Sequence, residues 1–238
     1  MQAVPSGARA PHPVLAALRG ALVASCQPVP GGAFDAPELV ALFARAVAAG
    51  GARGLRIEGL ANLRAVRAAV ALPVIGLVKR DLEDHPVRIT PFPDDARALA
   101  QAGAVIVAFD ATARARPATV AELVAAIHGA GALAMADCAT LDEARAALAI
   151  GADVVGTTMS GYTGPGAPPE EPDLGFLRAA CAELGAPVFA EGRFNTPALA
   201  AEAMRAGAHA VVVGSAITRP EVVAGWFVEA MAMPQMGN

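Results

Sequence analysis

The sequence predicts a single (β/α)8 barrel, because three patterns in it agree. Short, mostly apolar or β-branched runs recur along the 238-residue chain, and each run ends in a polar cluster. An alanine-rich stretch with helical spacing follows each run. Several of these stretches end in Gly-Ala, as at Gly103-Ala104, Gly151-Ala152 and Gly207-Ala208, where glycine stops a helix before the next strand. Such alternation is typical of parallel strands joined by crossover helices.

Each predicted strand is a short run of the kind that is buried on both faces of a sheet. In chain order the runs are LVASCQ (22–27), GLRI (54–57), VIGLVK (74–79), VIVAFD (105–110), LAMAD (133–137), VVGTT (154–158), VFAE (188–191) and VVVG (211–214). Eight runs fit a closed barrel, whose active site lies where the strands lead into the helices. An open doubly wound sheet is the alternative fold, but the GxGxxG turn that would favour it is absent.

The predicted helices lie between these strands and place small or apolar residues at helical spacing. Their ranges are 36–49, 60–70, 94–102, 120–130, 141–150, 173–184, 197–206 and 221–231. Residues 1–13 carry no apolar signal core, and we expect them to form a flexible N-terminal extension. Residues 14–238 are then one barrel domain.

Composition excludes several function classes. With 55% hydrophobic residues and a formal net charge of −4, the chain can bury a large core but has no clustered Lys and Arg for nucleic acid or a membrane surface. Cys26, Cys138 and Cys181 form no CxxC pair, so neither a disulfide framework nor a zinc knuckle is indicated. The four histidines suggest no metal triad. We expect a cytoplasmic protein without a metal.

A cation stands at the end of an apolar strand. Side chains alternate along a strand, so Lys79 shares a face with Leu77 and Ile75 and points into the mouth of the barrel, whereas Arg80 points toward the helices. The other strands also end in polar or small residues, which are Gln27, Arg56, Asp110, Asp137, Thr158, Glu191 and Gly214-Ser215. Exposure to water alone would favour polar strand ends, but a shared rim makes these residues one candidate site.

The last two strands carry a second signal. Gly192 and Arg193 follow the seventh strand, and Gly214 and Ser215 follow the eighth, where residues 215–218 could form a short helix. Loops in these places are the usual phosphate seat of such barrels, because free backbone N–H groups bind the anion. The alternative is that the glycines only allow tight turns. A phosphorylated small molecule is the favoured ligand.

A Gly/Pro-rich loop follows the sixth strand at residues 160–173. It is interpreted as a lid over the ligand that carries Tyr162, with a simple long connection as the alternative.

Nine segments together resemble N-acetylmannosamine-6-phosphate 2-epimerases, from about Leu18 to Pro220, in order and in register. They are SCQP (25–28), GLRIEG (54–59), IGLVKRD (75–81), RITP (88–91), FDAT (109–112), ADCATLDEA (136–144), GTTMSGYT (156–163), AEGRFNTP (190–197) and VVGSAITRP (212–220). The resemblance implies a TIM barrel, ribulose-phosphate-binding-like, that interconverts N-acetylmannosamine 6-phosphate and N-acetylglucosamine 6-phosphate in sialic acid breakdown. It also implies a cytoplasmic homodimer that needs no cofactor.

The resemblance also implies roles for individual residues. Lys79 and Glu191 match the catalytic positions of the family. The positions that hold the sugar or its phosphate are matched by Gln27, Arg56, Asp137 and Arg193. At the rim, Thr158 is a further candidate for binding the sugar, and the phosphate seat consists of Gly192, Arg193, Gly214 and Ser215. Two departures stand out: Ser215 replaces a common glycine, and Glu58 of RIEG adds a carboxylate where the family often reads RANG.

The chemistry of such an epimerase can be argued from these residues. Inverting C2 of an open-chain 2-acetamido sugar removes a proton beside the C1 aldehyde and returns one to the opposite face. Lys79 is a base only when neutral, and lowering an amine pKa from about 10.4 to near 7 costs about 4 kcal/mol. Apolar walls and a cation such as Arg56 both act in this direction. Glu191 then acts at the ring oxygen or C1 hydroxyl, or as the opposite-face acid.

Other readings remain open. Lys79 could instead form a structural ion pair with Glu191 or Asp137. Another phosphate-binding barrel enzyme, such as a thiazole synthase or a tryptophan-pathway enzyme, would share the rim of strands seven and eight. A catalytically silent sugar-phosphate sensor would need neither Lys79 nor Glu191.

Overall fold

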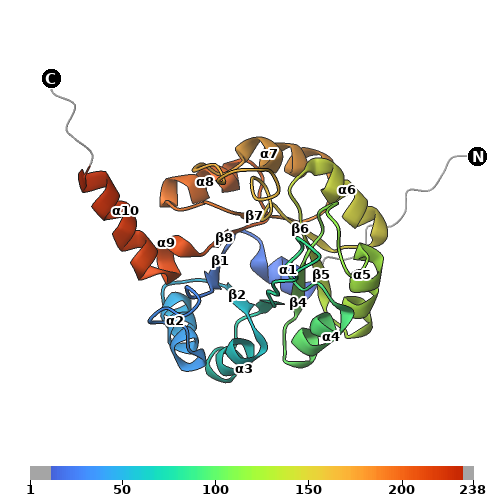
Figure 1. The fold of residues 1–238 in the computed structure, drawn as a ribbon, viewed down its shortest axis with the longest axis horizontal. Coiled ribbons are helices and arrows are strands. Elements are labelled where there is room, and N and C mark those ends of the chain that lie inside the picture. The colour runs from blue at the N-terminus through green and yellow to red at the C-terminus, as the bar shows by residue number, and fades with distance from the viewer. Residues whose placement is uncertain (1–11, 233–238) are drawn as a thin grey trace, which may run out of the picture.

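Eight parallel strands close into a barrel in which neighbours in the chain are neighbours in the sheet, until β8 pairs with β1 (Figure 1). The computed structural model describes residues 12–232. The strands are β1 (Ala21–Cys26), β2 (Gly54–Glu58), β3 (Val74–Leu77), β4 (Ile106–Asp110), β5 (Leu133–Asp137), β6 (Val154–Gly156), β7 (Val188–Glu191) and β8 (Ala210–Val213). The predicted (β/α)8 barrel is confirmed.

A ring of helices surrounds this barrel (Figure 1). The helices are α1 (Pro13–Leu18), α2 (Pro37–Ala49), α3 (Leu60–Ala69), α4 (Pro93–Gln101), α5 (Val120–Gly129), α6 (Leu141–Ile150), α7 (Leu174–Glu183), α8 (Pro197–Arg205), α9 (Ser215–Thr218) and α10 (Pro220–Ala232). Local sequence explains several of the starts. Pro37, Pro93 and Pro197 stand at the beginning of α2, α4 and α8, and Thr119 and Thr140 form capping boxes before α5 and α6.

The first helix was not predicted. Leu15 and Leu18 of α1 are buried in the same apolar cluster as Val23, which lies inside the barrel. The His209 ring nitrogen Nε2 lies 2.7 Å from the Leu15 carbonyl oxygen, so α1 covers the end of the barrel where β8 begins. Residues 1–11 of the predicted extension lie outside the described residues. The prediction missed α1 because a six-residue helix is too short for a periodic pattern.

Two strands, β3 and β6, end two residues earlier than predicted. β3 ends at Leu77, and Lys79 beyond it forms an isolated antiparallel bridge with Ile89, so the chain folds back on itself at the rim. β6 ends at Gly156, and the Met159 N–H donates to the Cys138 carbonyl of the preceding loop. The two polar residues predicted at these strand ends, Lys79 and Thr158, therefore lie on loop backbone just beyond the strands.

Alternation along the strands separates two apolar layers. Ile75, Leu77 and Phe189 pack inside the barrel, whereas Leu55 and Ile57 pack between the strands and the helices. The inward direction of Lys79 follows from this register and is confirmed. Arg80 points outward, as predicted, and it forms an ion pair with Asp95 of α4.

The last helix lies apart from the others. α10 extends away from the barrel beyond α9 (Figure 1), and none of its residues is buried. Phe227, Val228 and Met231 are 67%, 67% and 83% exposed. No helix within residues 12–232 combines the length and the hydropathy of a membrane span.

Candidate active site

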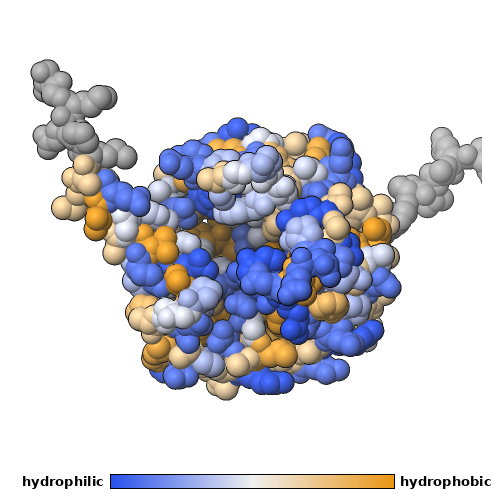
Figure 2. Space-filling view, in the orientation of Figure 1, coloured by the Kyte–Doolittle hydropathy of each residue, from blue (hydrophilic) through white to orange (hydrophobic). Residues whose placement is uncertain are grey.

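A cavity of about 400 Å³ opens at the carboxyl ends of the strands. Figure 2 shows the hollow at the centre of this face. The predicted site residues that line it are Gln27, Arg56, Lys79, Thr158, Glu191, Gly192, Arg193, Gly214 and Ser215. Asp137 is the exception, because it is fully buried behind Arg56 and contacts no cavity space. The topology thus brings together residues from six strand ends.

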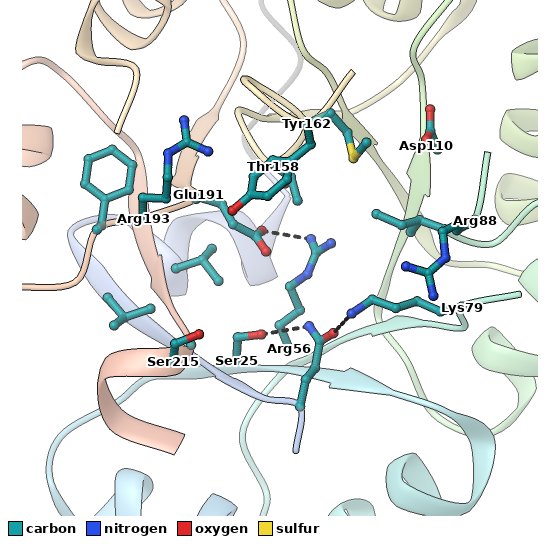
Figure 3. Close-up of a pocket in the computed structure, with 18 of the residues that line it drawn as sticks. Ser25, Arg56, Lys79, Arg88, Asp110, Thr158, Tyr162, Glu191, Arg193 and Ser215 are labelled. Atoms are coloured by element: carbon teal, nitrogen blue, oxygen red, sulfur yellow. Dashed lines mark hydrogen bonds and ion pairs between the residues drawn. The ribbon is translucent and has the colours of Figure 1, made fainter. Parts of the chain in front are cut away.

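Lys79 reaches into this cavity and holds Gln27. The Lys79 Nζ atom donates a hydrogen bond of 2.7 Å to the Gln27 Oε1 atom (Figure 3). Burial lowers the pKa of Lys79, and the charges of Arg56 and Arg219 lower it further, against opposing contributions from Glu58 and Glu191. The predicted direction of this shift is confirmed, and Arg219 is a second cation that sequence reasoning missed.

Arg56 is the buried centre of the site. Its Nη2 atom lies 2.6 Å from Asp137 Oδ2, and its Nη1 atom lies 2.9 Å from Glu191 Oε2. Thr158 Oγ1 also donates to Asp137, at 2.7 Å. The two carboxylates are therefore paired with Arg56, and the alternative in which one of them forms an ion pair with Lys79 does not hold in this structure.

Glu191 titrates near neutrality. Burial raises the pKa of its carboxyl, the nearby Asp137 adds to the rise, Arg56 opposes it, and the pKa of Glu191 is about 7. The contact with Arg56 is out of line with the N–H bonds, so Glu191 Oε2 accepts no hydrogen bond although the nitrogen is 2.9 Å away. A carboxyl with a pKa of about 7 can both give and take a proton at physiological pH.

The loops after β7 and β8 have the backbone that the sequence predicted. Gly192 has a φ of 102°, a conformation that favours glycine, and a Cβ added at Gly214 would lie 3.4 Å from the Ser25 Cβ. Ser215 begins the short helix α9, with none of the strain that a positive φ would impose. The left-handed backbone explains the glycine at 192, whereas a Cβ at Gly214 would make only ordinary van der Waals contacts with Ser25.

Arg193 forms hydrogen bonds with the 160–173 loop. Its Nε atom donates to the Glu171 carbonyl at 2.8 Å and its Nη1 atom to the Ser160 carbonyl at 2.9 Å. The guanidinium carbon lies 5.1 Å from the centre of the Tyr162 ring. Arg193 also has a φ of 63°, which is costly for a residue with a side chain. Sequence reasoning did not foresee that this residue ties the loop to the rim.

Further residues that the sequence prediction did not assign to the site line the cavity. Ser25, Arg88, Arg114 and Arg219 all line the cavity, and Arg219 Nε donates to the Gln27 carbonyl at 2.7 Å. Asp110 lies at the rim as predicted, but its carboxylate binds Thr112 and Arg114. Arg88 belongs to the RITP segment and Arg219 to the VVGSAITRP segment, and these segments were the available signal.

The cysteines are unsuited to nucleophilic chemistry. Cys26 and Cys138 face outward into the apolar layer under the helices. Burial raises the pKa of Cys26 to about 12 and raises that of Cys138 as well, so both stay protonated thiols. Within residues 12–232, no group of three or more His, Cys, Asp or Glu side chains has the arrangement of a metal site.

This arrangement is suited to moving protons on a small anion. An amine with a lowered pKa and a carboxyl of pKa about 7 share one cavity, and Figure 3 shows them on different sides of it, with Arg56 between them. The arginine residues that line the cavity supply positive charge at the rim, beside Gly192 and Gly214.

The chain matches known proteins along most of its length. Residues 40–233 match the protein family described as "Putative N-acetylmannosamine-6-phosphate epimerase". The "Bifunctional enzyme NanE/NanK" of Brucella melitensis is 60% identical over 220 residues, which are 91% of this chain but only 42% of that protein. The chain thus spans less than half the length of this relative.

Two further relatives match over nearly their whole length. A Salmonella agona protein described as "Putative N-acetylmannosamine-6-phosphate 2-epimerase" is 57% identical, over 90% of this chain and 93% of its own. The solved structure of the N-acetylmannosamine-6-phosphate 2-epimerase from Clostridium perfringens is 35% identical and superposes with a TM-score of 0.89, over 94% of this chain and 99% of that one.

Proposed function

The chain belongs to the N-acetylmannosamine-6-phosphate epimerase family, and on this premise we propose that it interconverts N-acetylmannosamine 6-phosphate and N-acetylglucosamine 6-phosphate. The enzyme is then a carbohydrate isomerase of sialic acid breakdown. One observation carries the proposal: Lys79 and Glu191, two groups whose pKa values are shifted toward neutrality, line a single cavity beside glycine loops.

The proposed reaction starts from the open-chain sugar. The neutral Lys79 amine takes the proton from C2 and becomes an ammonium, while the C–H electron pair forms a C1=C2 double bond and leaves negative charge on O1. The positive charge of Arg56 stabilises this enolate. Protonated Glu191 then gives its proton to the opposite face of C2, and the C1 aldehyde forms again. Proton exchange with water resets both groups.

The position of Glu191 supports its part in this scheme. Glu191 comes from β7 and Lys79 from the loop after β3, on different sides of the cavity (Figure 3). A proton donor on the side away from Lys79 is what an inversion at C2 requires. Glu191 is therefore proposed as the opposite-face acid.

The rest of the site anchors the substrate. Gly192, Gly214 and Ser215 are proposed to bind the phosphate through backbone N–H groups, and Arg193 through its Nη2 atom, because Nε and Nη1 bond the 160–173 loop. Binding this far end of the substrate fixes C2 against Lys79 and lowers the entropic barrier. Gln27, Arg56 and Thr158 contact the sugar at the cavity wall.

Asp137 is proposed to act through other residues. It lies behind Arg56, with its carboxylate bonded to Arg56 and Thr158, and it does not line the cavity. Asp137 is thus a positioning residue that holds Arg56 in place between Lys79 and Glu191.

Incubation with N-acetylmannosamine 6-phosphate in deuterated water tests the proposal. The expected result is N-acetylglucosamine 6-phosphate with deuterium at C2, and Lys79→Ala should abolish turnover with a modest loss of binding. A wild-type protein that binds the sugar and returns it unchanged would be a sensor, and the proposal would be wrong. A fully active Lys79→Ala variant would remove Lys79 from the mechanism.

We also propose a cytoplasmic homodimer. The three free cysteines suit a reducing compartment. Figure 2 shows apolar surface on α10, whose Phe227, Val228 and Met231 are largely exposed. An isolated helix with such a face is stabilised when a second copy of the chain covers it.

A further inference from the structure

The amine of Lys79 stands at the end of a chain of hydrogen bonds. Lys79 Nζ donates to Gln27 Oε1 at 2.7 Å, and Gln27 Nε2 donates to Ser25 Oγ at 2.8 Å (Figure 3). Ser25 and Gln27 lie on the inward face of β1 and its extension, and both are buried. The bonds therefore run within the wall of the cavity, from the Lys79 side to Ser25.

Ser25 lies directly against the loop that follows β8. A Cβ placed on Gly214 would be 3.7 Å from the Ser25 Oγ, so the hydroxyl is in contact with the proposed phosphate seat. Thr218 Oγ1 of α9 donates to the Ser25 carbonyl at 2.8 Å and fixes the backbone there. Within residues 12–232 the Ser25 hydroxyl donates to no protein acceptor, although it lines the cavity. Its hydrogen is available to a bound anion.

The orientation of the Gln27 amide decides whether Lys79 works as a base. With its oxygen toward Lys79, the amide accepts an N–H and leaves the lone pair of a neutral amine free. With its nitrogen toward Lys79, the amide would donate to that lone pair and block it. A serine hydroxyl can either donate or accept, so an unoccupied hydroxyl tolerates both orientations.

We propose that Ser25 is a positioning residue, which couples binding of the substrate phosphate to Lys79 through Gln27. This inference rests on the proposed function. When a phosphate oxygen accepts the Ser25 hydrogen, the Oγ atom can only accept from Gln27. The Gln27 nitrogen then stays with Ser25, its oxygen faces Lys79, and the amine lone pair points at C2. The Lys79 amine is therefore held ready to act as the base when a phosphorylated sugar is bound.

Two substrates and two variants test the coupling. Deuterium incorporation at C2 is measured for wild type, Ser25→Ala and Ser25→Thr, with N-acetylmannosamine 6-phosphate and with unphosphorylated N-acetylmannosamine. Thermal unfolding of each variant verifies that it is folded. Ser25→Ala is expected to lower kcat on the phosphorylated sugar about tenfold, with a change in KM below about threefold. Ser25→Thr keeps a hydroxyl and should recover most of this loss.

The unphosphorylated sugar distinguishes the proposed coupling through Ser25 and Gln27 from other roles of Ser25. Without a phosphate the hydroxyl is not held, so Ser25→Ala and wild type should turn over this sugar at similar rates. An equal loss on both sugars would mean a general structural role and would overturn the inference. A raised KM with an unchanged kcat would mean a plain phosphate contact and would also overturn it. A wild-type protein inactive on the phosphorylated sugar would overturn the proposed function itself.

Discussion

Arg56 Nη1 lies 2.9 Å from Glu191 Oε2, yet this oxygen accepts no hydrogen bond, because Arg56 is aligned on Asp137. The buried carboxyl therefore gains charge attraction without full hydrogen bonding. Such a contact leaves the pKa of Glu191 at about 7 and keeps the group able to give or take a proton. The same contact has a cost in stability, which is measurable.

Glu191→Gln is expected to be more stable than wild type at pH 8 and to lose this advantage as the pH falls toward 5. Folding raises the pKa of Glu191 from 4.5 to about 7, so the native state binds more protons than the unfolded state between these values. The stability of the wild type thus falls as the pH rises through this window. Urea unfolding across the pH range measures the difference, and a constant difference would contradict the buried-carboxyl argument.

Glu58→Gln is expected to shift the acid limb of kcat to lower pH. The charge of Glu58 raises the pKa of Lys79, against the lowering by burial, so its removal lets Lys79 lose its proton at lower pH. A pH profile of kcat measures the shift. Glu83→Gln removes the same charge from an exposed residue that does not act on Lys79, and it should leave the profile unchanged. Equal shifts in both variants would refute the assignment.

Arg193→Lys is expected to raise KM and to expose the 160–173 loop to proteases. A lysine lacks the fixed, planar arrangement of donors that bonds the carbonyls of Ser160 and Glu171, and it presents no planar group to Tyr162. Steady-state kinetics and limited proteolysis measure the two effects. Tyr162→Phe keeps the ring and serves as the matched control. A loop that is equally protected in both variants would show that Arg193 does not hold it.

Phe227→Glu combined with Met231→Glu is expected to convert a dimer into a monomer. Both residues are largely exposed on α10, and a carboxylate there would have to be desolvated in an interface. Light scattering after size-exclusion chromatography gives the mass in solution. Ile150→Glu changes an exposed apolar residue of α6 and should leave the mass unchanged. A wild-type monomer, or a double variant that stays dimeric, would exclude α10 as the contact.

The fold could be predicted because its signals are local. Strand runs such as VIVAFD and glycine stops such as Gly103 act over a few residues, and eight repeats of one unit leave few ways to close a sheet. Alternation along a strand also predicts that Lys79 points inward and Arg80 outward, which agrees with their positions in the structure. The polar ends of the strands supplied the candidate residues that line the cavity, and the resemblance to epimerases supplied their roles.

The sequence by itself therefore determined the barrel, the rim of polar residues, and the presence of a lysine and a carboxyl in one site. Only the tertiary structure decided which partners these side chains contact. Arg56 forms ion pairs with Asp137 and Glu191, Arg193 bonds the 160–173 loop, and Lys79 donates a hydrogen bond to Gln27. These partners are far apart in the chain, and each arginine had several carboxylates or carbonyls within plausible reach. Distances and angles select among such partners, and they are set by strand register and loop path, which no local pattern records.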